Sequence, residues 1–231
     1  MEKGRSIRPG SGGEIRPARP GFDEMISGLG ISLNSILDQR PILVAVAGPN
    51  GAGKSTFYNT HLRDGGLPFV NADILAAGLK LEPYVAASAA DGIRRTLLDQ
   101  GENFVSETVF SDPEGKKLRF LQEAALRGYT VVLFFVGVSR PEISDVRVGM
   151  RVAKGGHDVP KDKLFQRFPR TLKNLKASLS VLDHVYIIDN SNLLKPFQLV
   201  AHFEKRKVVV LRKPLPSWLG NVLTEDGELL A

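Results

Sequence analysis

Short apolar runs alternate with amphipathic stretches along most of the chain. A continuous apolar run predicts a strand buried on both faces at 42–47, and the most hydrophobic strand of the chain is predicted at 129–138. Shorter runs predict strands at 68–71, 103–107, 184–188 and 207–211. The intervening pattern predicts a helical turn at 74–78 and helices at 55–62, 84–100, 113–127, 141–154 and 161–182. Alternating strands and helices are typical of right-handed crossover connections between parallel strands. We therefore predict an α/β fold, a parallel sheet flanked by helices on both faces.

The two ends of the chain depart from this pattern. Residues 1–22 are rich in Gly, Pro, Arg and Ser and have no periodicity, which predicts a flexible basic tail. Residues 23–39 are weakly helical and are interrupted by Gly28 and Gly30, so a short helix packing on the domain is one interpretation. We predict one domain over residues 23–231, with its last residues loosely ordered.

Composition excludes several classes of protein. The 231 residues contain no cysteine, which rules out a disulfide framework, a thiolate metal site and a cysteine nucleophile. The longest apolar run, 131–138, is far shorter than the roughly 18 residues of a membrane span. The polar N-terminus has no apolar signal-peptide core. We expect a cytoplasmic protein with no membrane partner.

The segment that follows the first predicted strand matches the phosphate-binding pattern G-x-x-x-x-G-K-[ST]. Its backbone N–H groups and the start of the next helix would face phosphate oxygens, Lys54 would reach the terminal phosphates, and the Ser55 hydroxyl could bind Mg²⁺. A chance glycine-rich turn is the alternative, but the flanking strand and helix favour an ATP site with Mg²⁺. The predicted binding residues are Gly48, Pro49, Asn50, Gly51, Ala52, Gly53, Lys54, Ser55 and Thr56.

Other motifs narrow the class of P-loop protein. The chain lacks the N-K-x-D element of GTPases, and Gly155-Gly156-His157 matches the ABC-ATPase signature poorly. Asp189 follows the apolar run 185–188, where we interpret it as a strand-end residue rather than a Walker-B carboxylate. Among the classes of P-loop protein, these motifs favour a small-molecule kinase.

A kinase needs a carboxylate near the γ-phosphate to accept the proton of an attacking hydroxyl. Asp73 follows the second predicted strand and Glu107 ends the third, so both are expected on the same rim of the sheet as Lys54. Helix capping is the alternative for Asp73, and a solvated loop position is the alternative for Glu107.

Positive charge is concentrated in one stretch. The net charge is +6, and residues 140–176 hold ten Lys and Arg against four Asp and Glu, also a net of +6. Arg147 and Arg151 should share one helix face, and a second face carries Lys163, Arg167 and Arg170 on a helix that Pro169 bends. Our first interpretation of these faces is a basic lid over a polyphosphate. A solvated helix surface is the second interpretation, and a nucleic-acid site is the third. His157, in the intervening loop, is either a phosphate donor or a turn residue.

Five spaced motifs resemble the zeta-toxin family of P-loop kinases, in order from about residue 41 to residue 189. They are G-P-N-G-A-G-K-S-T, F-V-N-A-D-I-L-A, F-V-S-E-T-V-F-S, G-Y-T-V-V-L-F-F-V and R-V-x-x-x-R-V-A-K-G-G-H-D-V-P. The resemblance implies a nucleotide-kinase-like fold that transfers the ATP γ-phosphate to a sugar hydroxyl, with UDP-N-acetylglucosamine as the best-known acceptor. It also implies a separate antitoxin as a candidate partner, although no antitoxin module is obvious in this chain.

The resemblance also implies roles for individual residues. Asp73 corresponds to the base and Glu107 to a substrate contact, while Arg151 and Arg167 are the candidates for stabilising the transferring phosphate beside Lys54. We further expect the substrate side to include Asn71, Thr108 and His157. The G-G-H-D-V-P variant departs from the best-known toxins, which leaves the acceptor open.

Two other functions remain as alternatives. The basic tail and residues 140–176 could grip nucleic acid, as in a polynucleotide kinase, but no aromatic residue precedes Phe22 to stack on bases, so a nucleic-acid partner is disfavoured. The third hypothesis is a regulatory P-loop ATPase that acts through a protein partner.

Overall fold

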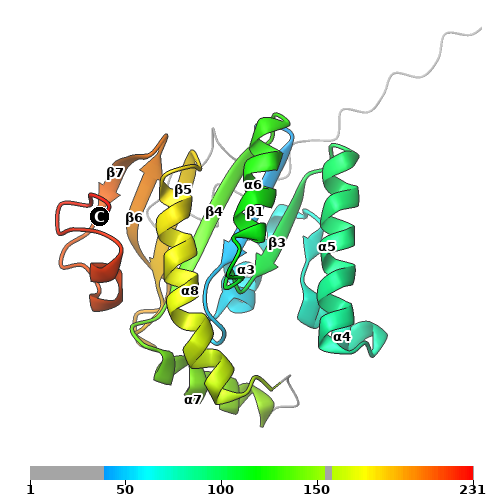
Figure 1. Ribbon diagram of the computed structural model, residues 1–231, viewed down its shortest axis with the longest axis horizontal. Helices are drawn as coiled ribbons and strands as arrows, with labels where there is room; N and C mark the ends of the chain where they lie inside the picture. Colours follow the sequence, from blue (N-terminus) through cyan, green and yellow to red (C-terminus); the bar gives the residue numbers. More distant parts are fainter. Residues whose placement is uncertain (1–38, 154–157, 231) are drawn as a thin grey trace, which may run out of the picture.

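A seven-stranded sheet forms the centre of the computed structural model, which describes residues 39–153 and 158–230 (Figure 1). The strand order is β2-β3-β1-β4-β5-β6-β7. The parallel strands, in chain order, are β1 (Ile42–Ala47), β2 (Phe69–Val70), β3 (Phe104–Thr108), β4 (Thr130–Gly137) and β5 (His184–Asp189). Two antiparallel strands, β6 (Gln198–Glu204) and β7 (Lys207–Leu211), complete one edge.

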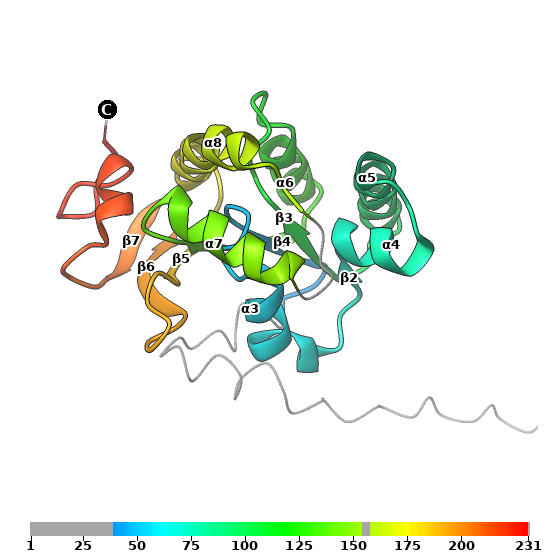
Figure 2. The same cartoon turned by 90° about the horizontal axis from the view of Figure 1, so that it is seen from below.

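Helices cover both faces of the sheet, as predicted. They are α3 (Lys54–His61), α4 (Ala72–Leu79), α5 (Pro83–Asp99), α6 (Lys116–Leu126), α7 (Pro141–Val152) and α8 (Lys161–Leu179), with short 3₁₀ segments η1 (Arg63–Gly65) and η2 (Ser217–Asn221). Figure 2 shows α5, α6 and α8 on one face and α3 on the opposite face. This arrangement confirms the predicted α/β class.

The central strand β1 shows why its sequence is continuously apolar. It lies between β3 and β4, and all six of its residues are buried. Leu43, Ala45 and Ala47 join the core under α5, α6 and α8, whereas Ile42, Val44 and Val46 join the core under α3. Because both faces are covered, no position along the strand favours a polar side chain.

The structure corrects the predicted start of α6. We predicted a helix from residue 113, but α6 begins at Lys116 after Gly115. The Asp112 carboxylate still accepts hydrogen bonds from the backbone N–H groups of Lys116 and Lys117. Asp112 therefore satisfies orphan amides of the first turn from outside the standard cap position.

The C-terminal part of the chain is more ordered than we predicted. Strand β6 was missed because charged and polar residues interrupt its apolar positions, as at His202. The final residues, predicted to be loosely ordered, bury Trp218, Leu219 and Val222 against the core. The Trp218 ring occupies the space above Gly137, where a Cβ atom would lie 2.3 Å from the ring.

Some predicted features lie outside the described residues. They are the tail at 1–22, nearly all of the segment 23–39, and His157. In the part of the chain that the structure describes, no helix has the length and apolar character needed to cross a membrane.

Candidate active site

The P-loop between β1 and α3 has a backbone that only glycine accommodates at key points. Gly48 and Gly51 have φ angles of +140° and +69°. A Cβ at Gly48 would lie 2.0 Å from the carbonyl oxygen of Val136, and one at Gly51 would lie 2.7 Å from that of Ser144. The loop therefore lies directly against β4 and α7, and these neighbours fix its shape.

The residue that follows β5 braces the loop from another side. Asn190 donates a hydrogen bond from Nδ2 to the carbonyl oxygen of Ala52 at 2.8 Å. The adjacent Asp189 accepts from the Trp218 Nε1–H at 2.8 Å and from the Ser191 hydroxyl at 2.6 Å. Asp189 thus has partners of its own at the strand end, which agrees with the strand-end interpretation rather than with a Walker-B role.

Lys54 is the most deeply buried cation of the site. Its side chain is 6% exposed, donates to the carbonyl oxygen of Pro49 at 3.0 Å, and lies 3.9 Å from Glu107 Oε1. Burial lowers the pKa of Lys54, whereas the charges of Glu107 and Asp73 act in the opposite direction. A buried ammonium group with so few acceptors favours the arrival of an anion such as phosphate.

Glu107 lies where three polar groups of the site converge. Its Oε2 accepts a hydrogen bond from the Ser55 hydroxyl at 2.8 Å and another from Asn71 Nδ2 at 2.6 Å. Because the Ser55 proton points to Glu107, the oxygen lone pairs of Ser55 remain available. A hydroxyl beside a carboxylate is the kind of oxygen donor set that suits Mg²⁺.

Within residues 39–153 and 158–230, no three His, Cys, Asp or Glu side chains gather to hold a metal ion by themselves. Mg²⁺ at Ser55 and Glu107 would therefore share its coordination with water and with phosphate oxygens, as is usual for this ion.

Asp73 stands in the first turn of α4 and does not cap that helix. Asn71 is the N-cap, and its Oδ1 accepts from the backbone N–H groups of Asp73 at 2.7 Å and Ile74 at 3.1 Å. The Asp73 carboxylate instead contacts Arg151 at 3.4 Å, with both side chains substantially exposed. The capping alternative for Asp73 is therefore wrong, and its carboxylate faces the cavity.

Arg94, on α5, is a site residue that the sequence analysis missed. It is 6% exposed and donates to the Ser106 hydroxyl at 2.6 Å, to the carbonyl oxygen of Glu107 at 2.9 Å, and to Asp91. Burial lowers the pKa of Arg94, and Asp91 opposes that shift. The guanidinium group thus holds the end of β3.

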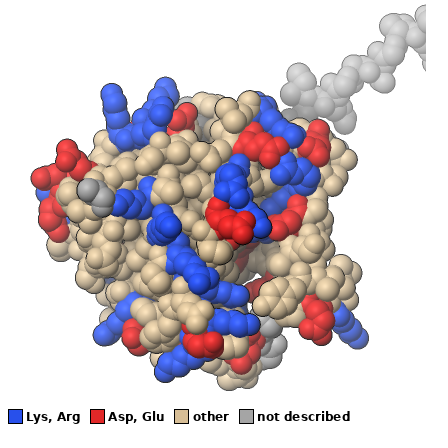
Figure 3. Space-filling view, in the orientation of Figure 1, with Lys and Arg blue, Asp and Glu red and all other residues tan. Residues whose placement is uncertain are grey.

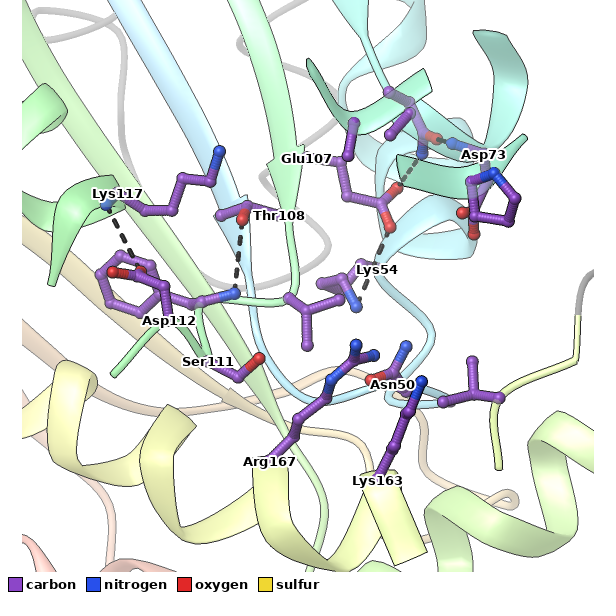
Figure 4. Close-up of a pocket in the computed structure, with 18 of the residues that line it drawn as sticks. Asn50, Lys54, Asp73, Glu107, Thr108, Ser111, Asp112, Lys117, Lys163 and Arg167 are labelled. Atoms are coloured by element: carbon purple, nitrogen blue, oxygen red, sulfur yellow. Dashed lines mark hydrogen bonds and ion pairs between the residues drawn. The ribbon is translucent and has the colours of Figure 1, made fainter. Parts of the chain in front are cut away.

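Lys54, Asn71, Asp73, Arg94 and Glu107 all line one cavity of about 580 Å³. Figure 4 shows Lys163 and Arg167 extending from α8 towards Lys54 and Asn50. Figure 3 shows a line of Lys and Arg side chains in the region of α8, next to a hollow. We call Lys54, Asn71, Arg94 and Glu107 the cavity floor. We call Lys163, Arg167 and Arg170 the cavity wall.

The cavity gathers most, but not all, of the predicted site residues. Those that line it are Asn50, Gly51, Lys54, Asn71, Asp73, Glu107, Thr108, Arg151 and Arg167. Ser55 lies next to it through Glu107, while Gly48, Pro49, Ala52, Gly53 and Thr56 form or follow the loop without lining the cavity. Asp112 and Lys117 line it and were not predicted; their signal was weak because both read as ordinary residues at a helix start.

Arg147 and Arg151 differ in position although they are four residues apart on α7. Arg151 lines the cavity, whereas Arg147 does not. Burial lowers the pKa of Arg147, and the charge of Asp189 opposes that shift. The single basic face predicted for α7 is therefore divided between the cavity and the end of β5.

Comparison with known proteins gives one family match. The zeta-toxin family model matches residues 85–197, from α5 to the residue before β6. The matched segment contains Glu107, Arg151 and Arg167 and begins after the P-loop and Asp73. An uncharacterized protein of Haemophilus influenzae is 27% identical over 126 residues, which cover 52% of this chain and 88% of that protein.

Solved structures share the fold at low sequence identity. A chain of the AvrRxo1-ORF1:AvrRxo1-ORF2 complex with sulphate ions has a TM-score of 0.54 at 16% identity, and the likeness covers 82% of this chain and 64% of that chain. The PezAT chromosomal toxin-antitoxin system of Streptococcus pneumoniae has a TM-score of 0.51 at 16% identity, covering 72% and 77%. This chain thus spans less than two thirds of the AvrRxo1 chain. The likenesses confirm the fold class, and the family match confirms the resemblance seen in the motifs.

Proposed function

Because the zeta-toxin family model matches residues 85–197 and the chain carries a P-loop in an α/β fold, we propose that it transfers the γ-phosphate of ATP to a hydroxyl group of a nucleotide sugar, with UDP-N-acetylglucosamine as the first acceptor to test. The observation that carries the proposal is the content of the cavity. It brings the P-loop lysine, two carboxylates from neighbouring strand ends, and the cations of α7 and α8 into one space. Phosphoryl transfer requires this combination of groups.

The P-loop supports a place for the triphosphate. Its N–H groups and the N-terminus of α3 would bind phosphate oxygens, and Lys54 would meet the terminal phosphates. When bound at Ser55 and Glu107, Mg²⁺ would neutralise charge on the phosphate oxygens. The AvrRxo1-ORF1:-ORF2 complex has also been solved with ATP, at a TM-score of 0.54, which supports ATP as the donor here.

The proposed transfer needs a base and cations, and different residues of the cavity would supply them. The acceptor oxygen attacks the γ-phosphorus and forms a new P–O bond, the bond from that phosphorus to the β–γ bridging oxygen breaks, and ADP leaves. The hydroxyl proton passes to Asp73, which acts as the base. Arg151 and Arg167 would stabilise the charge that develops on the phosphate. The Arg151–Asp73 pair is exposed and therefore weak, so phosphate can compete for the arginine.

The acceptor would occupy the part of the cavity away from the P-loop. Besides the P-loop residues, the cavity lining includes Tyr84, Thr108, Lys117 and Arg170, which offer a ring, a hydroxyl and two cations. A nucleotide sugar presents a base, hydroxyl groups and phosphates, so the lining suits it. The proposed substrate contacts at Asn71 and Glu107 lie nearer the P-loop.

A separate antitoxin is the proposed protein partner. The two structural relatives were solved as complexes or systems of paired proteins, AvrRxo1-ORF1 with AvrRxo1-ORF2 and PezAT as a toxin-antitoxin system. Co-purification of this chain with the product of a neighbouring gene would test that pairing.

The activity test uses mass spectrometry. The protein is incubated with Mg-ATP and either UDP-N-acetylglucosamine or a metabolite extract, and we expect a new species heavier by one phosphoryl group. Asp73→Asn should lower transfer by at least about a hundredfold while leaving ATP binding intact. Asp99→Asn is the matched control, because Asp99 pairs with Arg127 away from the cavity.

Three outcomes would contradict parts of the proposal. Equal turnover in Asp73→Asn removes that residue as the base. ATP consumption that rises with a protein partner, without a phosphorylated product, favours a regulatory ATPase. Submicromolar binding to single-stranded oligonucleotide that weakens steeply with salt favours a nucleic-acid kinase.

A further inference from the structure

Asn71 uses both ends of its side-chain amide inside the protein. It is 4% exposed and lies between β2 and α4. Its oxygen accepts two backbone N–H groups at the start of α4, and its nitrogen donates to Glu107 at 2.6 Å. The sequence analysis expected a substrate contact here, which stays a prediction. The contacts show a further task for the same amide.

The amide joins the two carboxylates that the proposed reaction needs. On one side it holds the first turn of α4, which carries Asp73. On the other side it holds Glu107, which in turn accepts from the Ser55 hydroxyl of the P-loop. We propose that Asn71 is a positioning residue that fixes Asp73 relative to Glu107 and the P-loop. This inference rests on the proposed function.

Only a planar side chain with a donor and an acceptor at this length makes all three bonds. Asp is as good an N-cap as Asn but cannot donate when ionised. Ser also caps helices, but its short hydroxyl cannot cap and reach Glu107 together. These two substitutions therefore separate the capping task from the bond to Glu107.

Charged groups surround the Asn71–Glu107 bond on several elements. Lys54, on α3, lies next to the Glu107 carboxylate. Arg94, on α5, donates a hydrogen bond to the backbone carbonyl of Glu107. Asp73 and Arg151 face it as a pair from α4 and α7, and the cavity wall on α8 adds cations across the cavity. In Asn71→Asp the introduced carboxylate would meet Glu107 within this set. The nearby cations moderate the repulsion between them without supplying the lost donor.

The key variant is Asn71→Asp, compared with wild type in steady-state transfer and in thermal melting. Its carboxylate keeps the cap of α4 but cannot donate to Glu107, and its charge would repel that carboxylate. We expect kcat to fall about tenfold or more, because α4 and Glu107 lose the bond that joins them. The KM for ATP should change by less than about twofold, because the contacts between the P-loop and phosphate are not altered.

Two further variants complete the test. Asn71→Ser keeps the cap without adding a charge and should lose about tenfold in kcat. Asn103→Asp is the matched control, because the Asn103 oxygen only accepts, from the backbone N–H of Ile42, and an introduced carboxylate keeps that bond. We expect this control to match wild type in kcat, in KM and in thermal midpoint.

The outcomes distinguish the inference from the function on which it rests. If wild type transfers phosphate and Asn71→Asp matches it in kcat and in thermal midpoint, Asn71 is a cap only and the inference fails. If Asn71→Asp lowers the thermal midpoint but keeps the kcat of wild type, the contact is structural and the positioning role fails. If wild type does not phosphorylate UDP-N-acetylglucosamine, the proposed acceptor fails, and the variants are compared through transfer to water, measured as phosphate release from ATP.

Discussion

The cavity floor and the cavity wall are both polar, but they are built differently. On the floor, Lys54, Asn71 and Arg94 are each at most 6% exposed, and each has hydrogen-bond partners within the protein. On the wall, Lys163 and Arg170 are exposed on α8, and Arg167 is partly exposed. The floor is therefore arranged before substrate arrives, whereas the wall can adjust its long side chains to it.

The largest expected effect separates activity from stability on the floor. Lys54→Met removes the P-loop cation and should reduce transfer by about a hundredfold to a thousandfold. The thermal midpoint should change little, because the variant removes the desolvation cost of a buried charge but also loses the contact with Glu107. Single-turnover rates and thermal melting measure the two effects. Lys116→Met, at an exposed lysine on α6, is the control, and a fall of several degrees in Lys54→Met would mean that Lys54 stabilises the fold.

Arg94→Lys tests whether the floor depends on geometry as well as charge. Lysine keeps the positive charge but cannot bond to Ser106, the Glu107 carbonyl and Asp91 at the same time. We expect a loss of about 1–3 kcal/mol in the free energy of unfolding, measured by denaturant titration, and a lower kcat. Arg95→Lys, at the next position and exposed, should change neither. If Arg94→Lys behaves as wild type, Arg94 acts through its charge alone and its directional hydrogen bonds are not required.

The smallest effect is expected on the wall and should depend on salt. Lys163→Gln removes one exposed cation, so the KM for ATP or for the acceptor should rise about twofold to fivefold at low ionic strength. The difference should shrink towards zero as salt is added, because exposed charges are screened. Lys173→Gln, on the same helix but away from the cavity, is the control. An effect that persists at high salt would make Lys163 a directional contact like those of the floor.

The same contrast explains what could be predicted from the sequence. The P-loop, β1 and the two rim carboxylates follow from local patterns, because a glycine-rich loop after a buried strand has few other uses. Arg94 could not be found in this way, since an arginine within a helix usually faces solvent and its partners come from β3. The position of Asp112, whose backbone carbonyl accepts from Asn174 on α8, and the existence of β6 likewise depend on contacts between distant segments.

The brace from Asn190 to Ala52 spans 138 positions of the chain. A growing polypeptide that has completed β1 and α3 already contains the whole nucleotide-binding motif. It still lacks Asn190, whose side chain holds the loop in place. Transplanting residues 48–55 into another scaffold would carry the signature without its support. We therefore expect nucleotide binding to require the finished fold, so that it could serve as a readout of its completion.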